Sequence, residues 1–219
     1  MTLMQRSDRS TTTAVTPDII AVLRADDADR YDPVVRILAE NGISGIELTL
    51  STPGTMDRLE TLRNTAPSGA KIGVGTVTTV EQVRRVLSIG ADFIVTPVTD
   101  LEVIAAAVDA GVPIYPGGLT PTELLRGWNA GATAVKVFPA SLVGPDYLAG
   151  LRGPFPDIQV VPSGGLGLTE AEAWIRAGAT GVSIGSPLLG DALRGGDPTS
   201  LAHRCARFVE AVHNGRQPR

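Results

Sequence analysis

The hydrophobic pattern of the chain repeats one phrase: a stretch of helical periodicity, a glycine, and a short apolar run typical of a buried strand. A clear example is RAGATGVSIGS at 176–186. A glycine just past a helix end adopts the left-handed conformation that closes the helix, so each phrase predicts a switch from helix to strand. The glycines of the five phrases are Gly42, Gly90, Gly111, Gly131 and Gly178.

The spacing of these glycines predicts the number of strands. The first and last intervals are much longer than the two middle ones, and each contains a further apolar run, KIGVGTV at 71–77 and DIQVVPSGG at 157–165. With IIAVLR at 19–24, eight strands are predicted, beginning near residues 19, 45, 71, 92, 113, 133, 158 and 181.

Eight strands that alternate with helices predict parallel pairing and a closed (β/α)8 barrel, the TIM barrel of the α/β class. The alternative is an open doubly wound sheet, which usually carries a GxGxxG phosphate turn after its first strand. Here the first strand ends in Leu23-Arg24-Ala25 without such a turn. We therefore predict a single barrel domain at 17–219, preceded by a flexible polar leader at 1–16.

The composition limits the classes of protein that fit. Of 219 residues 43% are hydrophobic, enough for a full core, and the formal net charge is −4. Lysine and arginine form no cluster, so nucleic acid and anionic membranes are not expected as main partners. No apolar run reaches the ~18 residues of a membrane span, and the first residues lack the apolar stretch of a secretory signal. The single cysteine, Cys205, excludes a disulfide framework and fits the reducing cytoplasm.

The chain offers little for metal chemistry. Its two histidines, His203 and His213, both lie in the amphipathic pattern LAHRCARFVEAVH near the C-terminal end. In that context histidines are mostly surface or helix-end residues. We expect no histidine-based triad, no metal site and no cofactor.

A charged residue interrupts the apolar pattern of the sixth predicted strand. In AVKVF, at 134–138, alternation turns Lys136 to one face and the flanking valines to the other. Helices cover the outside of a barrel and valines suit that side, so Lys136 is predicted to point inward, near the strand end where such barrels place the active site. There, desolvation can activate an amine as a nucleophile for a carbonyl. A structural ion pair, or an amine that reaches the solvent, is the alternative.

The second predicted strand, IELTL, carries a charge of opposite sign. Glu47 shares a face with Thr49 and Ser51, and it is a candidate general acid and base or, alternatively, a half-buried carboxylate paired with a neighbour. An inward amine together with an inward carboxylate, in a barrel without useful histidines, suggests Schiff-base chemistry.

Glycines close the last two predicted strands. Ser163-Gly164-Gly165 ends the seventh and Gly185-Ser186 ends the eighth. Loops after these strands commonly bind phosphate through backbone N–H groups, although the same residues also form ordinary turns. Glycines at both loops favour a small phosphorylated substrate.

The chain resembles the family of 2-keto-3-deoxy-6-phosphogluconate and 4-hydroxy-2-oxoglutarate aldolases over nearly all of 17–212. The phrases that carry the resemblance are IIAVLR, GIELTLSTPG, IGVGTVTTVEQV, FIVTP, PGGLTPTE, AVKVFPAS, VVPSGG and IGSPLL. The resemblance implies a class I pyruvate aldolase, a lyase that needs no metal and often forms a homotrimer.

By position, the resemblance makes Lys136 the Schiff-base lysine and Glu47 the catalytic glutamate. Thr76 matches a threonine that helps to hold the pyruvate carboxylate, and Arg24 matches an arginine that contacts substrate. The remaining substrate-binding residues that we expect are Ser51, Pro97, Ser163 and the phosphate-loop residues Gly164, Gly165, Gly185 and Ser186.

The motifs disagree on the exact substrate. We expect cleavage of 2-keto-3-deoxy-6-phosphogluconate to pyruvate and glyceraldehyde 3-phosphate, with the phosphogalactonate epimer or 4-hydroxy-2-oxoglutarate as alternatives. Phosphogluconate-type members usually read LRT where this chain reads LST with Ser51, so Arg24 is a candidate to bind the carboxylate instead. The STP phrase and SLVGPDYLAGL look more like the phosphogalactonate branch, whereas Ser163 looks like the phosphogluconate branch.

Two other classes of function share some of these features. A barrel isomerase, epimerase or synthase acting on a phosphorylated compound would share the phosphate loops, but it commonly needs metal-binding histidines or a cysteine–aspartate pair on the strands. A non-catalytic protein that binds a phosphorylated ligand would instead join Lys136 and Glu47 in a salt bridge.

Overall fold

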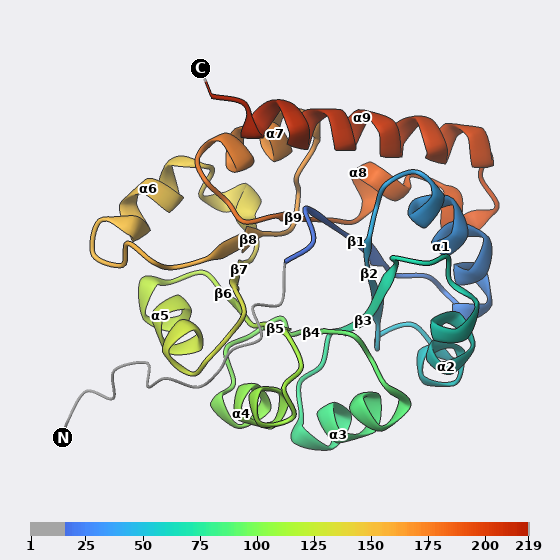
Figure 1. The fold of residues 1–219 in the computed structure, drawn as a ribbon, viewed down its shortest axis with the longest axis horizontal. Coiled ribbons are helices and arrows are strands. Elements are labelled where there is room, and N and C mark those ends of the chain that lie inside the picture. The colour runs from blue at the N-terminus through green and yellow to red at the C-terminus, as the bar shows by residue number, and fades with distance from the viewer. Residues whose placement is uncertain (1–15, 219) are drawn as a thin grey trace.

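The computed structural model describes residues 16–218, in which parallel strands lie at the centre of a ring of helices (Figure 1). The strands are β1 (Ile19–Leu23), β2 (Gly45–Thr49), β3 (Lys71–Gly75), β4 (Ile94–Val95), β5 (Ile114–Tyr115), β6 (Gly117–Gly118), β7 (Val135–Val137), β8 (Val160–Pro162) and β9 (Val182–Ile184). The α-helices are α1 (Tyr31–Glu40), α2 (Thr55–Thr65), α3 (Val80–Ile89), α4 (Leu101–Asp109), α5 (Pro121–Asn129), α6 (Asp146–Arg152), α7 (Leu168–Arg176), α8 (Ser186–Leu189) and α9 (Pro198–Arg216). Three short 3-10 helices are η1 (Ala28–Arg30), η2 (Ala140–Leu142) and η3 (Ala192–Arg194).

The strands pair in parallel and confirm the predicted barrel. One sheet has the order β5-β4-β3-β2-β1-β9 and the other the order β6-β7-β8. At one junction a parallel bridge joins Ser163 to Ser183, so the loop after β8 pairs with β9. At the other, β5 and β6 are halves of the predicted fifth strand, separated by Pro116, which has no N–H to donate. Its carbonyl accepts a hydrogen bond from the N–H of Lys136 at 2.8 Å, which holds this segment against β7.

Residues on the two faces of the strands pack into separate clusters. Val135 and Val137 belong to the large outer cluster between strands and helices. Ala134 belongs to a small inner cluster that fills the barrel, together with Ile20, Phe93, Val95, Tyr115 and Val161. The Phe93 and Tyr115 rings meet edge to face, with centroids 5.8 Å apart. The side chains of the inner cluster therefore fill the barrel interior. Polar residues inside the barrel lie beside this packed core and not along an open pore.

Two helices begin with reciprocal side-chain caps. The Thr120 hydroxyl accepts from the N–H of Glu123 while the Glu123 carboxylate accepts from the N–H of Thr120, with Pro121 as the first residue of α5. Thr79 and Gln82 form the same reciprocal pair at α3. These caps fix where helices begin after the strand ends, and hence the shape of the barrel rim.

Most of the predicted leader, residues 1–15, lies outside the described residues, and its flexibility stays a prediction. Thr16 is described: it is buried, and its side chain forms a hydrogen bond with Tyr115 of the inner cluster. Between residues 16 and 218, no helix is both long and apolar enough to cross a membrane.

Candidate active site

Lys136 lies in the middle of β7, between Gly117 of β6 and Val161 of β8 in the strand register. It is only 7% exposed, and its neighbours Val135 and Val137 face the outer cluster. Strand alternation therefore turns Lys136 into the barrel, as the sequence predicts. Its Nζ lies 5.0 Å from the centroid of the Phe138 ring, so an aromatic face shields one side of the amine.

Glu47 lies in the middle of β2 and is almost fully buried, at 2% exposed. The residues on either side of it, Ile46 and Leu48, belong to the outer cluster, so the carboxylate points inward. It lies directly over Gly75 of β3, where a Cβ atom would overlap Oε1. The absence of a side chain at Gly75 thus creates the space that the carboxyl group occupies.

The electrostatic environment of Glu47 is unusual for a carboxylate. Burial raises its pKa above the ordinary value, while the positive charges of Lys136 and Arg24 act in the opposite direction. Its Oε2 is buried and has no hydrogen-bond partner within the described residues. A buried oxygen without a hydrogen-bond partner lowers the stability of the folded state. Such an atom is typical of a group that binds a substrate or takes up a proton.

Lys136 and Glu47 therefore face the same interior from β7 and β2. They are close enough for the amine to influence the pKa of the carboxyl group, yet no ion pair joins them within the described part of the chain. The arrangement leaves a buried amine and an available carboxyl group, which can form a covalent intermediate with a carbonyl and move its protons.

Thr76 follows β3 directly and has a strained backbone. With φ of 60°, it is the one non-glycine residue of positive φ among residues 16–218. A β-branched residue rarely adopts this conformation, and strain of this kind concentrates at functional sites. Thr76 directly follows Gly75, the residue over which the Glu47 carboxyl group of β2 lies, and its binding role stays a prediction.

Pro97 lies at the end of β4, beside the strand that precedes Lys136. Its carbonyl oxygen is so close to Gly117 that a Cβ atom there would come within 2.5 Å of it. Because Gly117 is the register partner of Lys136, Pro97 lies in the wall next to the amine. The structure thus brings Pro97 to the same part of the barrel as Lys136.

The glycine loop after β8 packs tightly on the loop after β7. Gly164 and Gly165 have φ of 92° and 74°, in the left-handed region that favours glycine. A Cβ at Gly164 would lie 3.2 Å from the Phe138 ring, and one at Gly165 would lie 2.7 Å from Cβ of Ser141. Neither position has room for a side chain, so only backbone groups can line this loop.

The other predicted residues of this region lie close by. Ser163 is buried and its hydroxyl forms a 3.1 Å hydrogen bond with that of Ser183, so it joins β8 to β9 rather than standing free. Gly185 follows β9, and Ser186 begins α8. The glycine loops predicted to bind phosphate are thus at the ends of neighbouring strands, β8 and β9.

Arg24 and Ser51 line one cavity of about 320 Å³ at the ends of β1 and β2, which we call the rim cavity. Ser51 donates a hydrogen bond to the Thr49 hydroxyl at 3.2 Å, and Thr49 donates to the carbonyl of Leu23 at 3.0 Å. These bonds tie the ends of the two strands together. The other residues that line the rim cavity are Ala25, Asp26, Leu193 and Arg194.

The sequence gives no signal for Arg194. It lies on η3, outside every motif and far along the chain from Arg24, and only the folding of the barrel brings the two to one cavity.

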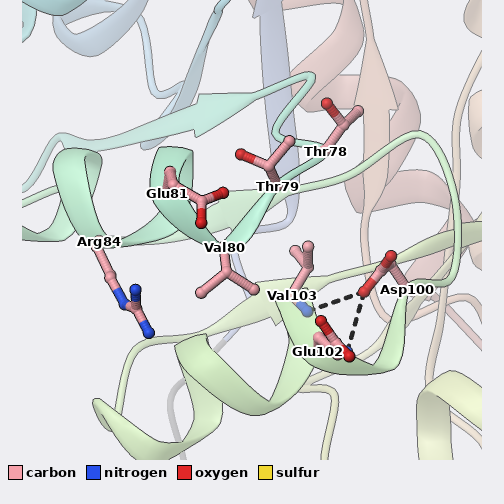
Figure 2. Close-up of a pocket in the computed structure, with 8 residues that line it drawn as sticks. All are labelled: Thr78, Thr79, Val80, Glu81, Arg84, Asp100, Glu102 and Val103. Atoms are coloured by element: carbon pink, nitrogen blue, oxygen red, sulfur yellow. Dashed lines mark hydrogen bonds between the residues drawn. The ribbon is translucent and has the colours of Figure 1, made fainter.

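A second cavity of about 380 Å³ lies between the starts of α3 and α4 (Figure 2). Its acidic side chains are Glu81, Asp100 and Glu102, against one basic side chain, Arg84. As Figure 2 shows, Asp100 already accepts hydrogen bonds from backbone N–H groups of α4. This acidic rim is poorly suited to an anionic substrate, so the interior around Lys136 and Glu47 is the candidate active site.

One change tests whether the space over Gly75 matters. We expect Gly75→Ala to lower kcat/KM by on the order of 100-fold, because the added methyl group displaces the Glu47 carboxyl group from its position. Gly150→Ala is the matched control, since a Cβ there, in α6, meets nothing within 4 Å. Activity of the purified variants, with thermal unfolding to confirm the fold, is the measurement. Full activity in Gly75→Ala would show that the carboxyl group does not need this space.

Comparison with known proteins identifies the family. The family model described as "Aldolase: KDPG and KHG aldolase" matches residues 11–201. Over 200 residues the chain is 33% identical to a probable 2-dehydro-3-deoxy-6-phosphogalactonate aldolase of Rhizobium meliloti, covering 91% of this chain and 94% of that one. The 2-dehydro-3-deoxy-6-phosphogalactonate aldolase of Escherichia coli is 34% identical, with 91% and 96% covered. A 2-dehydro-3-deoxy-phosphogluconate aldolase of Haemophilus influenzae is 37% identical, with 68% and 71% covered.

Solved structures agree with these sequence matches. The native KDPGal structure superposes with a TM-score of 0.83 at 33% identity, covering 90% of this chain and 95% of that one. KDPG aldolase from Legionella pneumophila, solved with pyruvate captured at low pH as a covalent carbinolamine intermediate, superposes with a TM-score of 0.81 at 28% identity, with 90% and 96% covered. With the barrel, the inward amine and carboxyl group, and these matches together, the chain belongs to the family of KDPG and KHG aldolases and is a lyase.

Proposed function

We propose that this chain is a class I aldolase that cleaves a 2-keto-3-deoxy-6-phospho sugar acid to pyruvate and glyceraldehyde 3-phosphate. The observation that carries the proposal is the buried pair inside the barrel: the Lys136 amine and the Glu47 carboxyl group, whose Oε2 has no partner within the described residues. An amine nucleophile and an available acid and base are the groups that imine chemistry requires.

The reaction begins at the C2 ketone. The Lys136 amine adds to C2 to form a carbinolamine, and loss of water, with Glu47 moving the protons, gives a protonated imine. The imine nitrogen then withdraws electrons from C3. Glu47, its carboxylate ionised, removes the proton of the C4 hydroxyl, the C3–C4 bond breaks, and the aldehyde leaves as its electrons form an enamine. Protonation at C3 and hydrolysis of the imine release pyruvate and restore the amine.

The raised pKa of Glu47 suits the proton transfers of this reaction. A carboxyl group whose pKa is raised by burial accepts a proton more readily than an ordinary surface carboxylate, and as the neutral acid it can return that proton. Thr76 and Pro97, at the ends of β3 and β4, border the interior where the C1 carboxylate of the substrate would lie. The glycine loops after β8 and β9 offer backbone groups for the phosphate.

Borohydride reduction in the presence of pyruvate tests the imine directly. The chain contains two lysines, and the second, Lys71, is exposed at the opposite end of the barrel, at the start of β3. We expect a stable pyruvate adduct on the peptide that carries Lys136 and none on the peptide that carries Lys71, which is an internal control. An unmodified Lys136 peptide would favour an isomerase or a non-catalytic binder of the phosphorylated ligand.

For the substrate, we propose that the phosphogalactonate epimer is cleaved in preference to the phosphogluconate epimer. The support is that two relatives named for phosphogalactonate match 91% of the chain at 33% and 34% identity, whereas relatives named for phosphogluconate match 68% of it at 37% identity or 82% of it at 30% identity. The phrases STP and SLVGPDYLAGL also favour the phosphogalactonate epimer, whereas Ser163 favours the phosphogluconate epimer. A coupled assay of pyruvate release from both epimers, side by side, decides between them.

We propose that Arg24 binds the C1 carboxylate of the substrate. Phosphogluconate-type members of the family usually carry an arginine for this contact at the position where this chain has Ser51. The positive charge of Arg24 acts to lower the pKa of the buried Glu47, and Arg24 lines the rim cavity beside Ser51. We expect Arg24→Met to raise the pyruvate concentration needed for half-maximal borohydride trapping about tenfold, through loss of a charge-assisted hydrogen bond. Unchanged trapping would show that Arg24 does not contact the carboxylate.

We also propose, from the family resemblance, that the chain is a cytoplasmic enzyme that forms a homotrimer. Sedimentation velocity of the purified protein tests the trimer, and a monomer would overturn it.

A further inference from the structure

The rim cavity presents a charged side chain that the reaction above leaves without a role, Arg194. It comes from η3, between α8 and α9, and it lines the cavity together with Arg24. Neither guanidinium has an ion-pair or hydrogen-bond partner within the described residues. Asp26 is the single carboxylate of the lining, so the cavity carries a net positive charge and favours an anion.

The segment that carries Arg194 is held in place from α9. The Arg204 guanidinium donates hydrogen bonds of 2.7 Å to the carbonyls of Leu188 and Leu189 and lies 3.8 Å from the Asp191 carboxylate. Leu193, next to Arg194, is 8% exposed and packs into the outer cluster. The backbone at Arg194 is therefore held in place, while its guanidinium has no partner within the described residues and is available to an anion.

The substrate carries two anionic groups, and their distances from the buried Lys136 amine determine which of them can reach Arg194. The C1 carboxylate is bonded to C2, the carbon that Lys136 attacks, so it must lie close to a buried amine. Both arginines are exposed, but Arg24 directly follows β1, the strand paired with Glu47 of β2, whereas Arg194 lies on η3 beyond α8. In line with this, the charge of Arg24 is among those that act on Glu47 and the charge of Arg194 is not. An anion at Arg194 must therefore lie at the far end of the carbon chain, where the substrate carries its phosphate.

We propose that Arg194 binds the phosphate of the substrate and sets the preference of this enzyme for phosphorylated over unphosphorylated keto acids. The inference rests on the aldolase reaction proposed above. The glycine loops after β8 and β9 contribute backbone N–H groups, and Arg194 adds the full positive charge that a phosphate dianion binds most strongly. The substrate thus extends from Lys136 past Arg24 to Arg194.

Arg194→Met keeps the aliphatic part of the side chain and removes its charge. We expect kcat/KM for the phosphorylated substrate to fall about 10- to 100-fold, mainly through KM, as expected for the loss of a charge-assisted contact. For the unphosphorylated 2-keto-3-deoxy acid, kcat/KM should stay within about threefold of the wild type, because the contact is missing from both enzymes. Borohydride trapping of pyruvate on Lys136 should be unchanged. Arg207→Met is the matched control, since Arg207 is exposed on α9 and lies outside the cavity lining.

The outcomes separate this inference from the reaction on which it rests. If the wild type traps pyruvate and cleaves the phosphorylated substrate, but Arg194→Met cleaves it equally well, the phosphate contact is wrong and the aldolase stands. An equal loss on both substrates would also overturn the contact, because it would show a structural effect. Failure of the wild type to trap pyruvate would overturn the aldolase reaction itself.

Discussion

The Lys136→Arg variant is expected to fold normally and to lose turnover by on the order of 10⁴-fold or more, the scale seen when an enzyme loses its nucleophile. An arginine side chain stays protonated in proteins and cannot form an imine with a ketone. It preserves a positive charge near Glu47, so the electrostatic environment of the carboxyl group changes little. Pyruvate release, borohydride trapping and thermal unfolding of the purified variant measure the effect.

Two further variants complete this experiment. Lys136→Ala removes both the nucleophile and the charge, and it is expected to be equally inactive. Lys71→Arg changes the other lysine of the chain, which is exposed at the far end of β3, and it should keep full activity. Full activity in either Lys136 variant would remove this residue from the mechanism.

The barrel could be predicted because its elements repeat a local pattern. Each glycine after a helical stretch marks a turn that backbone sterics require, and positive φ at Gly42, Gly90, Gly111, Gly131 and Gly178 confirms all five. The inward direction of Lys136 followed from the same local rule, since a strand turns alternate residues to opposite faces. The one departure is the fifth strand, which Pro116 divides into β5 and β6 because it cannot donate a hydrogen bond.

Other features of the site depend on contacts between distant segments and leave no local pattern. The space for the Glu47 carboxyl group depends on Gly75 of a neighbouring strand, and its Oε2 has no partner within the described residues. The positive φ of Thr76 is invisible in the sequence, because a β-branched residue is a poor predictor of that conformation. Arg194 reaches the rim cavity only because α8 packs against β1 and η3, which follows it, packs against α1. Local periodicity thus predicts the barrel and the inward charges, whereas the details of their environment require the folded chain.

Glu47→Gln is expected to lower kcat by about 10²- to 10⁴-fold, the usual contribution of a general acid and base. Glutamine matches the shape of the carboxyl group over Gly75, so the interior should keep its packing. The amine of Lys136 remains, and pyruvate should still be trapped by borohydride, although more slowly. This separates the variant from Lys136→Arg, which loses both trapping and turnover.

The pH dependence gives a second, independent sign of the role of Glu47. Burial raises the pKa of its carboxyl group, and the ionised form is the one that removes the C4 hydroxyl proton. The rate of the wild type should therefore fall as the pH decreases through this raised pKa, at a higher pH than the ~4.3 of an ordinary glutamate would give. In Glu47→Gln that acidic limb should disappear from the residual activity. If the variant keeps the wild-type acidic limb, another group supplies the base, and Glu47 serves only to position the substrate.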